Sequence, residues 1–415
     1  MDARRTAWCA ASGALIVVAA ITAIAAPDWF SVAGSAATAL AVVCGLLALS
    51  GIVYTAWTAR LVGGFFARSV PTPASFPPVT LVKPLHGDEW NLDGQLASFF
   101  EQDYPGPVQL LFGVHDAADV ALQTVDALRQ RYPHAHVTVV ADSRLHGPNR
   151  KVSNLVNMLP AAEHDVLCFT DSDVTVERDF LRRVVGELQQ PDIGLVTCLY
   201  RGQCQPGFWP RVSAAATDYQ FLPGVVAGLA IGRARPCFGQ TIAMTRDTLT
   251  RIDGLARFAS HLAEDNAIGE AIRDTGAKVA IPPFVVRHAC AETTFSRLVS
   301  HELRWSRTIR AVDRSGHFGS LVTYPLAWAA LAALLSGGAA WSWPLVALAL
   351  VARGVLKQQV DRVTGERCRG LWVLPISDIV SFSIFIASFL SGRVVWRGVD
   401  FGVDGKGQLY PLRND

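Results

Sequence analysis

Apolar runs at both ends of the chain frame a middle region with a different pattern. Residues 6–26 carry no charge and follow two arginines, and residues 33–57 form a second apolar run that ends before Arg60. Each run is long enough to cross the roughly 30 Å hydrocarbon layer of a membrane. Because Lys and Arg next to a span favour the cytoplasmic side, the chain after Arg60 is expected in the cytoplasm. The alternative for the first run is a cleaved signal peptide, since residues 23–25 (Ala-Ile-Ala) resemble a cleavage site; this alternative leaves the orientation of the main domain unchanged.

The middle region begins after a proline-rich linker, where short apolar runs start to alternate with amphipathic stretches. The runs predict strands at residues 79–84, 108–114, 137–141, 166–170 and 194–198. The amphipathic stretches predict helices at residues 92–102, 119–131, 151–159 and 179–189. Strands alternating with helices indicate a mostly parallel sheet covered by helices. The sequence therefore predicts an α/β domain over residues 69–320, after an N-terminal membrane hairpin over residues 1–68.

The last part of the chain, residues 321–415, turns apolar again. Residues 321–335 and 343–356 form a possible helical hairpin broken at Ser336-Gly337-Gly338, and residues 371–390 form a last span. The first two segments are short for full spans, so a re-entrant or interfacial arrangement stays open. A basic cluster favours return of the chain to the cytoplasmic face; it comprises Arg353, Lys357, Arg362, Arg367 and Arg369. The side of the C-terminal tail, which contains Arg393 and Arg397, is left open.

Composition supports a membrane protein whose polar domain lies in a reducing compartment. Only 17% of the residues are charged, against about 25% in a typical soluble domain. The net charge of +2, without a block of like charges, argues against a nucleic-acid partner. The eight cysteines are scattered and form no CxxC pair, which fits free thiols better than a disulfide framework.

The strongest chemical signal is Asp171-Ser172-Asp173, directly after the predicted strand at residues 166–170. This position brings carboxylates to the crevice where open α/β sheets bind ligands. Their oxygens suit Mg²⁺ or Mn²⁺, which would also bind substrate phosphates and offset charge on a departing diphosphate. By itself the motif is weak, because a strand-to-helix turn often carries Asp as a helix cap.

Other polar residues accompany this motif in a fixed order. Asp116 follows another predicted strand, Glu264-Asp265 lies downstream, and His301-Glu302-Leu303-Arg304-Trp305 falls on an amphipathic helix before the membrane region. Each has a structural alternative: a turn cap, a helix start and a membrane-surface anchor, respectively. Lys83 at a strand end and Arg150-Lys151 at a helix start are further candidates for phosphate contacts, with solvated lysine and basic helix start as equal alternatives.

This ordered set resembles the ceramide glucosyltransferase family of GT-A enzymes, from about Thr80 through the C-terminal membrane region. The resemblance is sharpened by residues 81–87 (LVKPLHG), 102–105 (QDYP) and 149–154 (NRKVSN). Residues 150–154, 198–202 and 302–305 look most like the bacterial hopanoid branch of the family. The resemblance implies a GT-A (Rossmann-like) domain between membrane helices, at the bacterial inner membrane. It further implies inverting transfer of N-acetylglucosamine from UDP-N-acetylglucosamine to a hopanoid polyol, bacteriohopanetetrol, with glucose transfer to ceramide as the alternative.

The resemblance also assigns roles residue by residue. Asp116 would bind the uridine end of the donor, and Asp171 with Asp173 would serve the metal and the diphosphate. Asp265 would be the catalytic base, with Glu264 as its rival. Arg304 with Trp305 would close the donor site, and His301 would donate a hydrogen bond to phosphate. The chain departs from the family at His301, where Gln or Arg is usual, and Asp173 is less secure than Asp171.

Two segments outside the motifs carry expectations about the lipid side. Residues 219–229 (YQFLPGVVAGL) are apolar inside the predicted cytoplasmic domain and are interpreted as an interfacial segment on the acceptor side, with buried core as the alternative. Asp378 lies inside the last apolar segment, so its side chain should face protein or water. A processive polysaccharide synthase would need more membrane helices. A transporter or membrane scaffold with a cytoplasmic domain is a further alternative; a transporter should carry polar groups at the membrane midplane, whereas nearly all the candidate chemistry here lies outside the membrane segments.

Overall fold

The computed structural model describes residues 35–365, 370–390, 394–396, 399–403 and 409–411. The chain divides into two compact units. A sheet unit comprises Ala67–Pro210, Arg235–Thr293 and Gly392–Asp415. A helical unit comprises Met1–Phe66, Arg211–Ala234 and Thr294–Ser391. The predicted span at residues 6–26 lies outside the described residues, as do Arg367, Arg369, Arg393 and Arg397.

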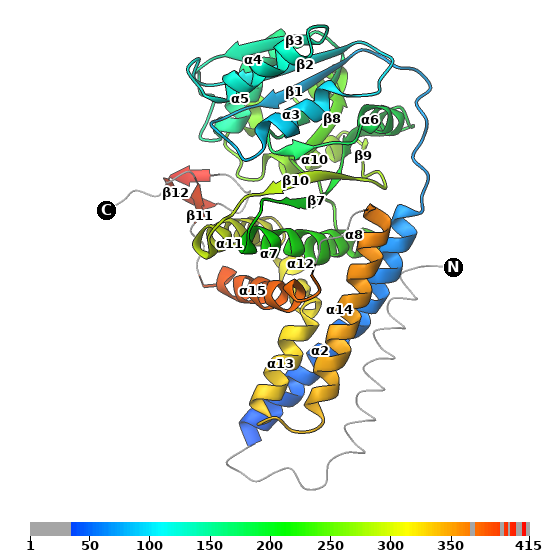
Figure 1. Cartoon of the computed structure of the whole chain (residues 1–415), viewed down its shortest axis with the longest axis vertical. Coiled ribbons are helices and arrows are strands. Elements are labelled where there is room, and N and C mark those ends of the chain that lie inside the picture. The colour runs from blue at the N-terminus through cyan, green and yellow to red at the C-terminus, as the bar shows by residue number, and fades with distance from the viewer. Residues whose placement is uncertain (1–34, 366–369, 391–393, 397–398, 404–408, 412–415) are drawn as a thin grey trace. The chain divides into compact units, whose positions relative to one another are not determined.

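The sheet unit is built on a seven-stranded mixed sheet (Figure 1). In spatial order its strands are β3 (His136–Ala141), β2 (Val108–Val114), β1 (Val79–Pro84), β4 (Val166–Thr170), β8 (Thr241–Thr245), β6 (Ile193–Thr197) and β9 (Lys278–Ala280). The strands β3, β2, β1 and β4 are parallel, as are β6 and β9, whereas β8 runs antiparallel to both its neighbours. The predicted α/β fold with a mostly parallel sheet is therefore confirmed, and β8 is the exception.

Helices cover both faces of this sheet. They are α3 (Leu92–Phe100), α4 (Ala121–Arg131), α5 (Arg150–Met158), α6 (Phe180–Leu188), α9 (Arg246–Arg251) and α10 (Glu264–Asp274), with 3-10 turns at Leu159–Ala161 and Ala256–Phe258. On one face Met158 of α5 and Ile272 of α10 share a hydrophobic cluster with Val82 and Leu167 of the strands. Strand side chains alternate between faces, so Lys83 points to the opposite side. There it contacts Phe99 of α3.

Two smaller sheets complete the unit. The strands β5 (Val174–Thr175), β10 (Val285–Cys290) and β7 (Leu199–Cys204) form one, and β11 (Val394–Trp396), β12 (Val399–Val403) and β13 (Leu409–Pro411) form the other. In the first sheet His288 of β10 pairs with Val174 of β5, directly after the Asp-Ser-Asp motif. The sequence patterns did not predict β5, β7, β8, β9 or β10, because these strands are short or carry polar residues.

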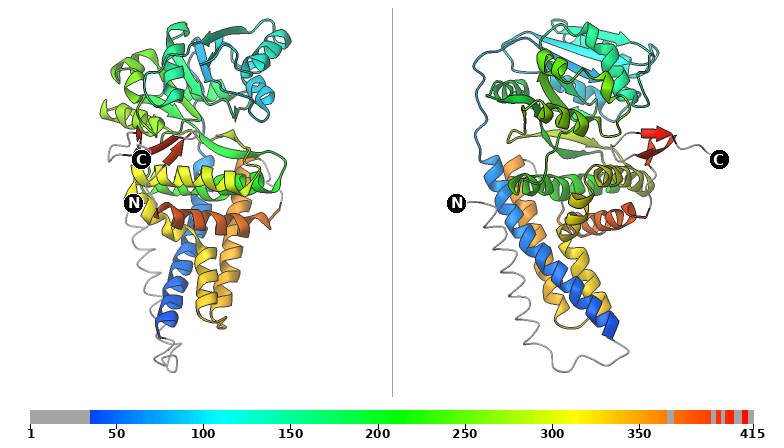
Figure 2. Two further views of the ribbon diagram at one scale, coloured as in Figure 1. Left: turned by 90° about the vertical axis from the view of Figure 1, so that its left-hand side faces the viewer. Right: turned by 180° about the vertical axis from the view of Figure 1, so that it is seen from behind.

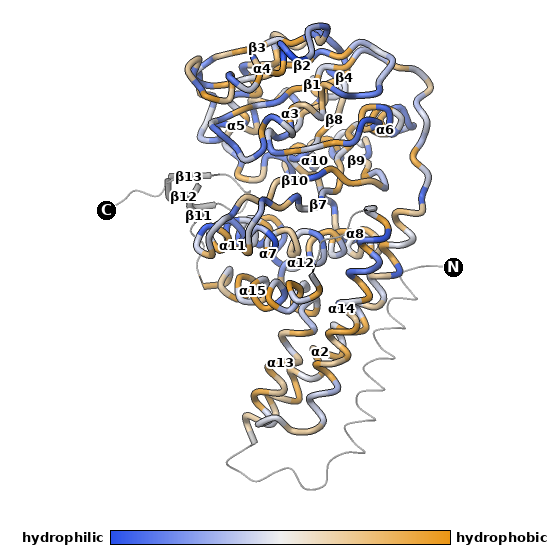
Figure 3. Tube along the Cα trace, in the orientation of Figure 1, coloured by the Kyte–Doolittle hydropathy of each residue, from blue (hydrophilic) through white to orange (hydrophobic). Residues whose placement is uncertain are grey.

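The helical unit contains one long apolar helix, α2 (Ser35–Phe66). The other elements are α7 (Phe208–Ala216), a π-helical turn at Thr217–Phe221, α8 (Leu222–Ala230), α11 (Phe295–Val312), α12 (Arg314–Gly319), a 3-10 turn at Ser320–Thr323, α13 (Pro325–Leu335), α14 (Ser342–Thr364) and α15 (Val373–Ser388). Helices α2, α13 and α14 run side by side (Figure 2). Apolar residues extend along most of α2 and α13 (Figure 3).

Among the described helices, α2 is the one that is long and apolar enough to cross a membrane by itself. The stretch Arg314–Thr323 with Pro325–Leu335 qualifies only as a pair bent by 64°. The predicted break after α13 is confirmed, since Gly337 and Gly338 have φ angles of 64° and 80°, in the left-handed region that glycine tolerates. The further spans stay a prediction.

Asp378 lies within the helical unit, buried against Arg353 of α14. The guanidinium donates from Nε to Oδ2 at 2.8 Å and from a terminal nitrogen to Oδ1 at 2.6 Å. The third arm of Arg353 donates to the carbonyl of Tyr219 at 2.7 Å. Lys357 is buried as well and pairs with Asp361. Arg353 and Lys357, part of the basic cluster that favours return of the chain to the cytoplasmic face, are thus internal ion-pair partners, and the topology stays a prediction.

The boundaries of the two compact units differ from those of the predicted α/β domain, residues 69–320. Residues 211–234 and 294–320 lie in the helical unit, where α8 packs on α2 and α11 packs on α15. Both segments form helices with apolar faces, and these faces pack against other helices of the same unit. The faces of the main sheet are covered by the helices of the sheet unit. The apolar stretch at residues 219–229, expected at the lipid side, falls on the π-helical turn and α8 of this unit.

Candidate active site

The candidate site lies where the order of the sheet reverses. The chain moves outward from β1 through β2 to β3, then returns to place β4 on the other side of β1. At such a point the carboxyl ends of neighbouring parallel strands leave a crevice, the usual ligand site of an open α/β sheet. At this edge Lys83, the next-to-last residue of β1, donates to Thr170, the last residue of β4, and Asp171 follows directly.

Lys83 is fully buried beneath this edge. Its ammonium donates to Thr170 Oγ1 at 3.0 Å and to the carbonyl of Asp171 at 2.8 Å, and it lies 3.6 Å from the centre of the Phe99 ring. Burial lowers the pKa of Lys83 to about 7, against the attraction of Asp171 and Asp173. Through these two hydrogen bonds, Lys83 holds the backbone in place at the start of the Asp-Ser-Asp motif.

The two motif aspartates have different partners. Asp173 Oδ2 lies 3.2 Å from Nδ1 of His288, a buried residue of β10. Burial lowers the pKa of His288, but the Asp173 carboxylate outweighs it and raises that pKa to about 9. Burial likewise raises the pKa of Asp173, and His288 outweighs it, so the net shift is downward. Asp173 Oδ1 is buried and has no hydrogen-bond partner among the described residues.

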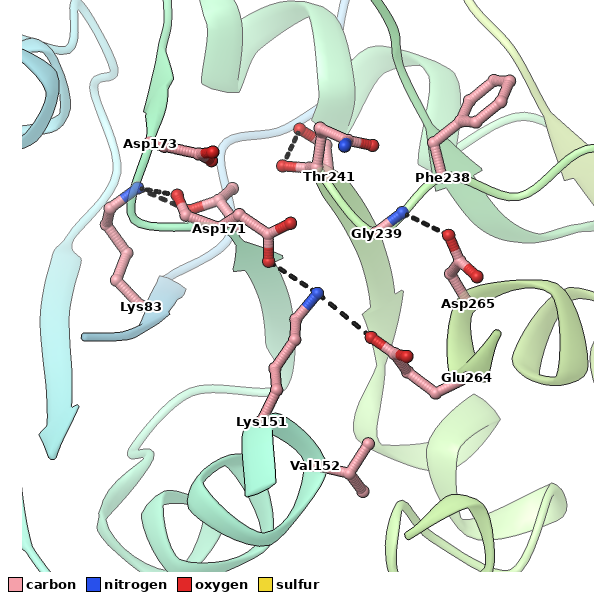
Figure 4. Close-up of polar contacts among 12 residues, drawn as sticks. Lys83, Lys151, Val152, Asp171, Asp173, Phe238, Gly239, Thr241, Glu264 and Asp265 are labelled. Atoms are coloured by element: carbon pink, nitrogen blue, oxygen red, sulfur yellow. Dashed lines mark hydrogen bonds and ion pairs between the residues drawn. The ribbon is translucent and has the colours of Figure 1, made fainter. Parts of the chain in front are cut away.

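Lys151, in the first turn of α5, bridges the motif to the Glu-Asp element (Figure 4). Its Nζ lies 2.6 Å from Asp171 Oδ1 and 3.1 Å from Glu264 Oε1. Burial lowers the pKa of Lys151, but the carboxylates of Asp171 and Glu264 outweigh burial and raise it, so this amine stays charged. The predicted donor-side residue Lys151 is thus at the centre of the cluster.

Asp265, in the first turn of α10, faces the same place. Its Oδ2 accepts from the backbone N–H of Gly239 at 2.9 Å, and its Oδ1 accepts from the N–H of Asn266 at 2.7 Å. Burial, together with the neighbouring charge of Glu264, raises the pKa of Asp265 to about 7. A carboxylate with a pKa near neutrality can exchange a proton with a substrate at physiological pH.

Gly239 marks the point on which these groups converge. A Cβ built on Gly239 would lie 3.0 Å from Lys151 Nζ, 3.5 Å from Asp265 Oδ2 and 3.8 Å from Asp171 Oδ2. A small cavity beside it is lined by Lys151, Asp171, Gly239 and Glu264, with apolar walls from Leu155, Phe169 and Ile242. The absence of a side chain at Gly239 therefore keeps the approach to three functional groups open.

The predicted residues Asp116 and Arg150 lie outside this cluster. Asp116 is exposed after β2, and its Oδ1 accepts from the N–H of Ala118 at 2.9 Å, which makes it a turn cap in this structure. Because β2 is parallel to β1, Asp116 still lies at the same end of the sheet as Lys83 and Asp171. Arg150 begins α5 with an exposed side chain that makes no ion pair with the described carboxylates of the cluster.

The predicted His301, Arg304 and Trp305 belong to the helical unit. They lie on α11, which begins after Thr294, whose side chain caps the helix by accepting from the N–H of Arg297. All three side chains are half-buried. The His301 and Trp305 rings pack edge to face with centres 4.7 Å apart. Their roles at the donor site stay predictions, because that site lies in the other unit.

Sequence reasoning missed three residues that shape the cluster. His288 pairs with Asp173, and Gly239 leaves room beside Lys151. Asn149, fully buried, caps α5 by accepting from Val152 N–H at 3.1 Å and donates to Glu264 at 3.1 Å. The signal for Asn149 was present, since it is a good helix-capping residue directly before Arg150-Lys151. His288 and Gly239 carry no local pattern.

Comparison with known proteins gives the family. A model of glycosyl transferase family 21 matches residues 43–409. The chain belongs to glycosyl transferase family 21. Among curated relatives, ceramide glucosyltransferase 1 of Caenorhabditis elegans is 24% identical over 272 residues, which is 63% of this chain and 57% of the relative. Ceramide glucosyltransferase of Komagataella phaffii is 29% identical over 127 residues, 30% of this chain and 25% of the relative.

The family 21 chain also has solved structural neighbours. The mannosyltransferase of Pyrobaculum calidifontis, solved with GDP-Man and Mn²⁺, is 19% identical, with a TM-score of 0.47 over 84% of this chain and 99% of that one. The family assignment confirms the predicted resemblance to ceramide glucosyltransferases at the family level. The chain spans about half the length of the first of the curated relatives and a quarter of the other.

Proposed function

We propose that this family 21 glycosyltransferase moves a hexose from a UDP-sugar to a hydroxyl group of a membrane lipid, with inversion at the anomeric carbon. The relatives favour ceramide as the acceptor, because the two curated relatives described above are ceramide glucosyltransferases. The observation that carries the proposal is the convergence of Lys151, Asp171 and Asp265 on the open space at Gly239. One cation and two carboxylates around a single point suit the transfer of a sugar between a diphosphate and a hydroxyl.

The donor side of this site consists of Lys151 and the two motif aspartates. The charged Lys151 ammonium is placed to hold diphosphate oxygens. Asp171 and Asp173 fit a divalent cation: both offer hard oxygen ligands, and Asp173 Oδ1 is buried without a described partner. Mg²⁺ and Mn²⁺ commonly bind through one or two carboxylates plus substrate phosphates. Such an ion would offset the charge that develops on the departing diphosphate.

On the acceptor side, Asp265 is the proposed base. Its carboxylate takes the proton of the lipid hydroxyl as the oxygen attacks the anomeric carbon and the bond to the diphosphate breaks. The N–H groups of Gly239 and Asn266 hold both carboxylate oxygens in place, which reduces the reorganisation needed at the moment of transfer. Glu264 is engaged by Lys151 and Asn149, so it is the less available of the two neighbouring carboxylates.

A lipid-acceptor assay tests the proposal. The purified full chain is incubated with radiolabelled UDP-glucose or UDP-N-acetylglucosamine, and with ceramide or bacteriohopanetetrol in mixed micelles. Glucosylated ceramide with a β linkage is the expected product. N-acetylglucosamine on the hopanoid, without turnover of ceramide, would select the hopanoid branch suggested by residues 150–154, 198–202 and 302–305. Absence of any labelled lipid, with a chain that binds UDP-sugars, would contradict a lipid acceptor.

A further inference from the structure

A group of side chains of the types that can ligate a metal lies at the opposite end of the main sheet's strands from the carboxylate cluster. His136 is the first residue of β3, and Glu163 with His164 comes just before β4. These are the amino ends of parallel strands, whereas Lys83 and Asp171 lie at their carboxyl ends. One ligand atom from each of the three residues lies within 4.8 Å of the other two.

One histidine of this group, His164, has a buried ring nitrogen without a hydrogen-bond partner among the described residues. His136 Nε2 lies 3.3 Å from Glu163 Oε1, and both side chains are half-exposed, which by itself describes a weak surface pair. His164 takes part in no described ion pair, although it stands beside both. The buried nitrogen is its Nε2. Buried polar atoms without a partner are rare in folded proteins, and a metal ion can supply the partner that a ring nitrogen lacks.

Buried residues behind the group hold its backbone and its carboxylate in place. Gln109, which is fully buried, donates from Nε2 to Glu163 Oε1 at 3.2 Å and accepts from the N–H of Glu163 at 2.9 Å. Thr80 accepts from the N–H of His164 at 3.2 Å and donates to Gln109 at 2.8 Å. Hydrogen bonds of this kind, behind a ligand, orient it and strengthen metal binding.

We propose that His136, Glu163 and His164 form a transition-metal site that takes Zn²⁺. Two imidazoles and one carboxylate suit Zn²⁺ and related first-row ions, whereas Mg²⁺ prefers oxygen ligands throughout. Three protein ligands leave a fourth position for water, which the exposure of His136 and Glu163 allows. The ion ties the edge strand β3 to the loop before β4, so it stabilises the sheet unit at a place remote from sugar transfer.

The site is tested by metal binding to the purified, untagged full chain in detergent. The protein is stripped of metal, kept in excess Mg²⁺ to occupy oxygen-only sites, and titrated with Co²⁺, whose absorption reports tetrahedral nitrogen and oxygen ligands. Zn²⁺ affinity is then measured by displacement of Co²⁺. His164→Gln and Glu163→Gln remove ligands. His134→Gln removes an exposed histidine two residues from His136 and is the matched control.

The wild-type chain and His134→Gln should bind one Co²⁺ that Zn²⁺ displaces, and Zn²⁺ should raise their melting temperature. His164→Gln and Glu163→Gln should weaken Zn²⁺ binding at least about tenfold, since even an outer-shell partner is worth about 10–100-fold. Each variant should keep the wild-type melting temperature without metal, which shows that it folds. Equal Zn²⁺ affinity in wild type and His164→Gln, or no displaceable Co²⁺ in the wild type, would overturn the site. Transferase activity does not enter this test, so its outcome is independent of the proposed function.

Discussion

Asp265→Asn separates the role of a catalytic base from that of a structural carboxylate. The amide keeps the shape of the side chain but cannot accept the acceptor's proton. Loss of a general base lowers turnover by roughly 10²–10⁴-fold. In the wild type, the pKa of Asp265 rises from 3.8 to about 7 through burial and the charge of Glu264. The base is therefore protonated at low pH, and wild-type turnover should rise as the pH increases through about 7.

The same substitution should leave the fold equally stable or make it more stable. Because the pKa of Asp265 is higher in the folded than in the unfolded chain, its negative charge opposes folding, and this cost grows between pH about 4 and pH about 7. A rise in the pKa of Asp265 from 3.8 to about 7 corresponds to a folding cost of roughly 4 kcal/mol at pH 8. The amide has one oxygen in place of two, so one of the N–H groups of Gly239 and Asn266 loses its acceptor, which costs about 1–3 kcal/mol. A net gain of about 1–3 kcal/mol at pH 8 remains.

Two measurements check this reasoning. Turnover of UDP-sugar and lipid is measured for Asp265→Asn and for wild type at pH 6 to 8.5, and the melting temperature is measured at pH 8 and near pH 4. A gain of about 1 kcal/mol raises the melting temperature by roughly 2–4 °C in a unit of this size. The gain should vanish toward pH 4. Near-wild-type turnover would remove Asp265 from the mechanism, and a large fall in melting temperature at pH 8 would refute the assigned electrostatics.

Three further predictions concern the donor side. Chelation with EDTA should abolish transfer and either Mg²⁺ or Mn²⁺ should restore it, whereas full activity in the chelator would exclude a metal at the Asp-Ser-Asp motif. Gly239→Ala places a methyl group 3.0 Å from Lys151 Nζ, so it should lower turnover at least about tenfold with little change in melting temperature; unchanged kinetics would show that substrates avoid this space. Arg304→Lys loses the planar fork with which Arg304 is predicted to bind the donor diphosphate, so it should raise the KM for the UDP-sugar strongly, while His301→Gln should be tolerated. Equal damage by these two substitutions would show that the motif is misaligned.

Much of the sheet unit could be predicted from local patterns. The strand that contains Lys83 and the strands that precede Asp116 and Asp171 are mostly apolar, because parallel strands covered on both faces bury nearly every side chain. Strand β8 was missed because antiparallel pairing with β4 has no signature in its five residues. The Asp-Ser-Asp motif at a strand end and the Glu-Asp pair at a helix start were also visible, since both positions follow from chain order alone.

The sequence by itself determined the fold class, the family and the carboxylates of the candidate site, because those depend on periodicity and on motifs within a few residues of each other. Only the tertiary structure decided the partners. Lys151 joins Asp171 to Glu264, His288 pairs with Asp173, and Arg353 pairs with Asp378, each across 20 or more residues of chain. A buried charged side chain needs a partner, because an unpaired charge in the interior is costly. The packing of the elements determines which residue becomes that partner, and no local sequence pattern reveals it.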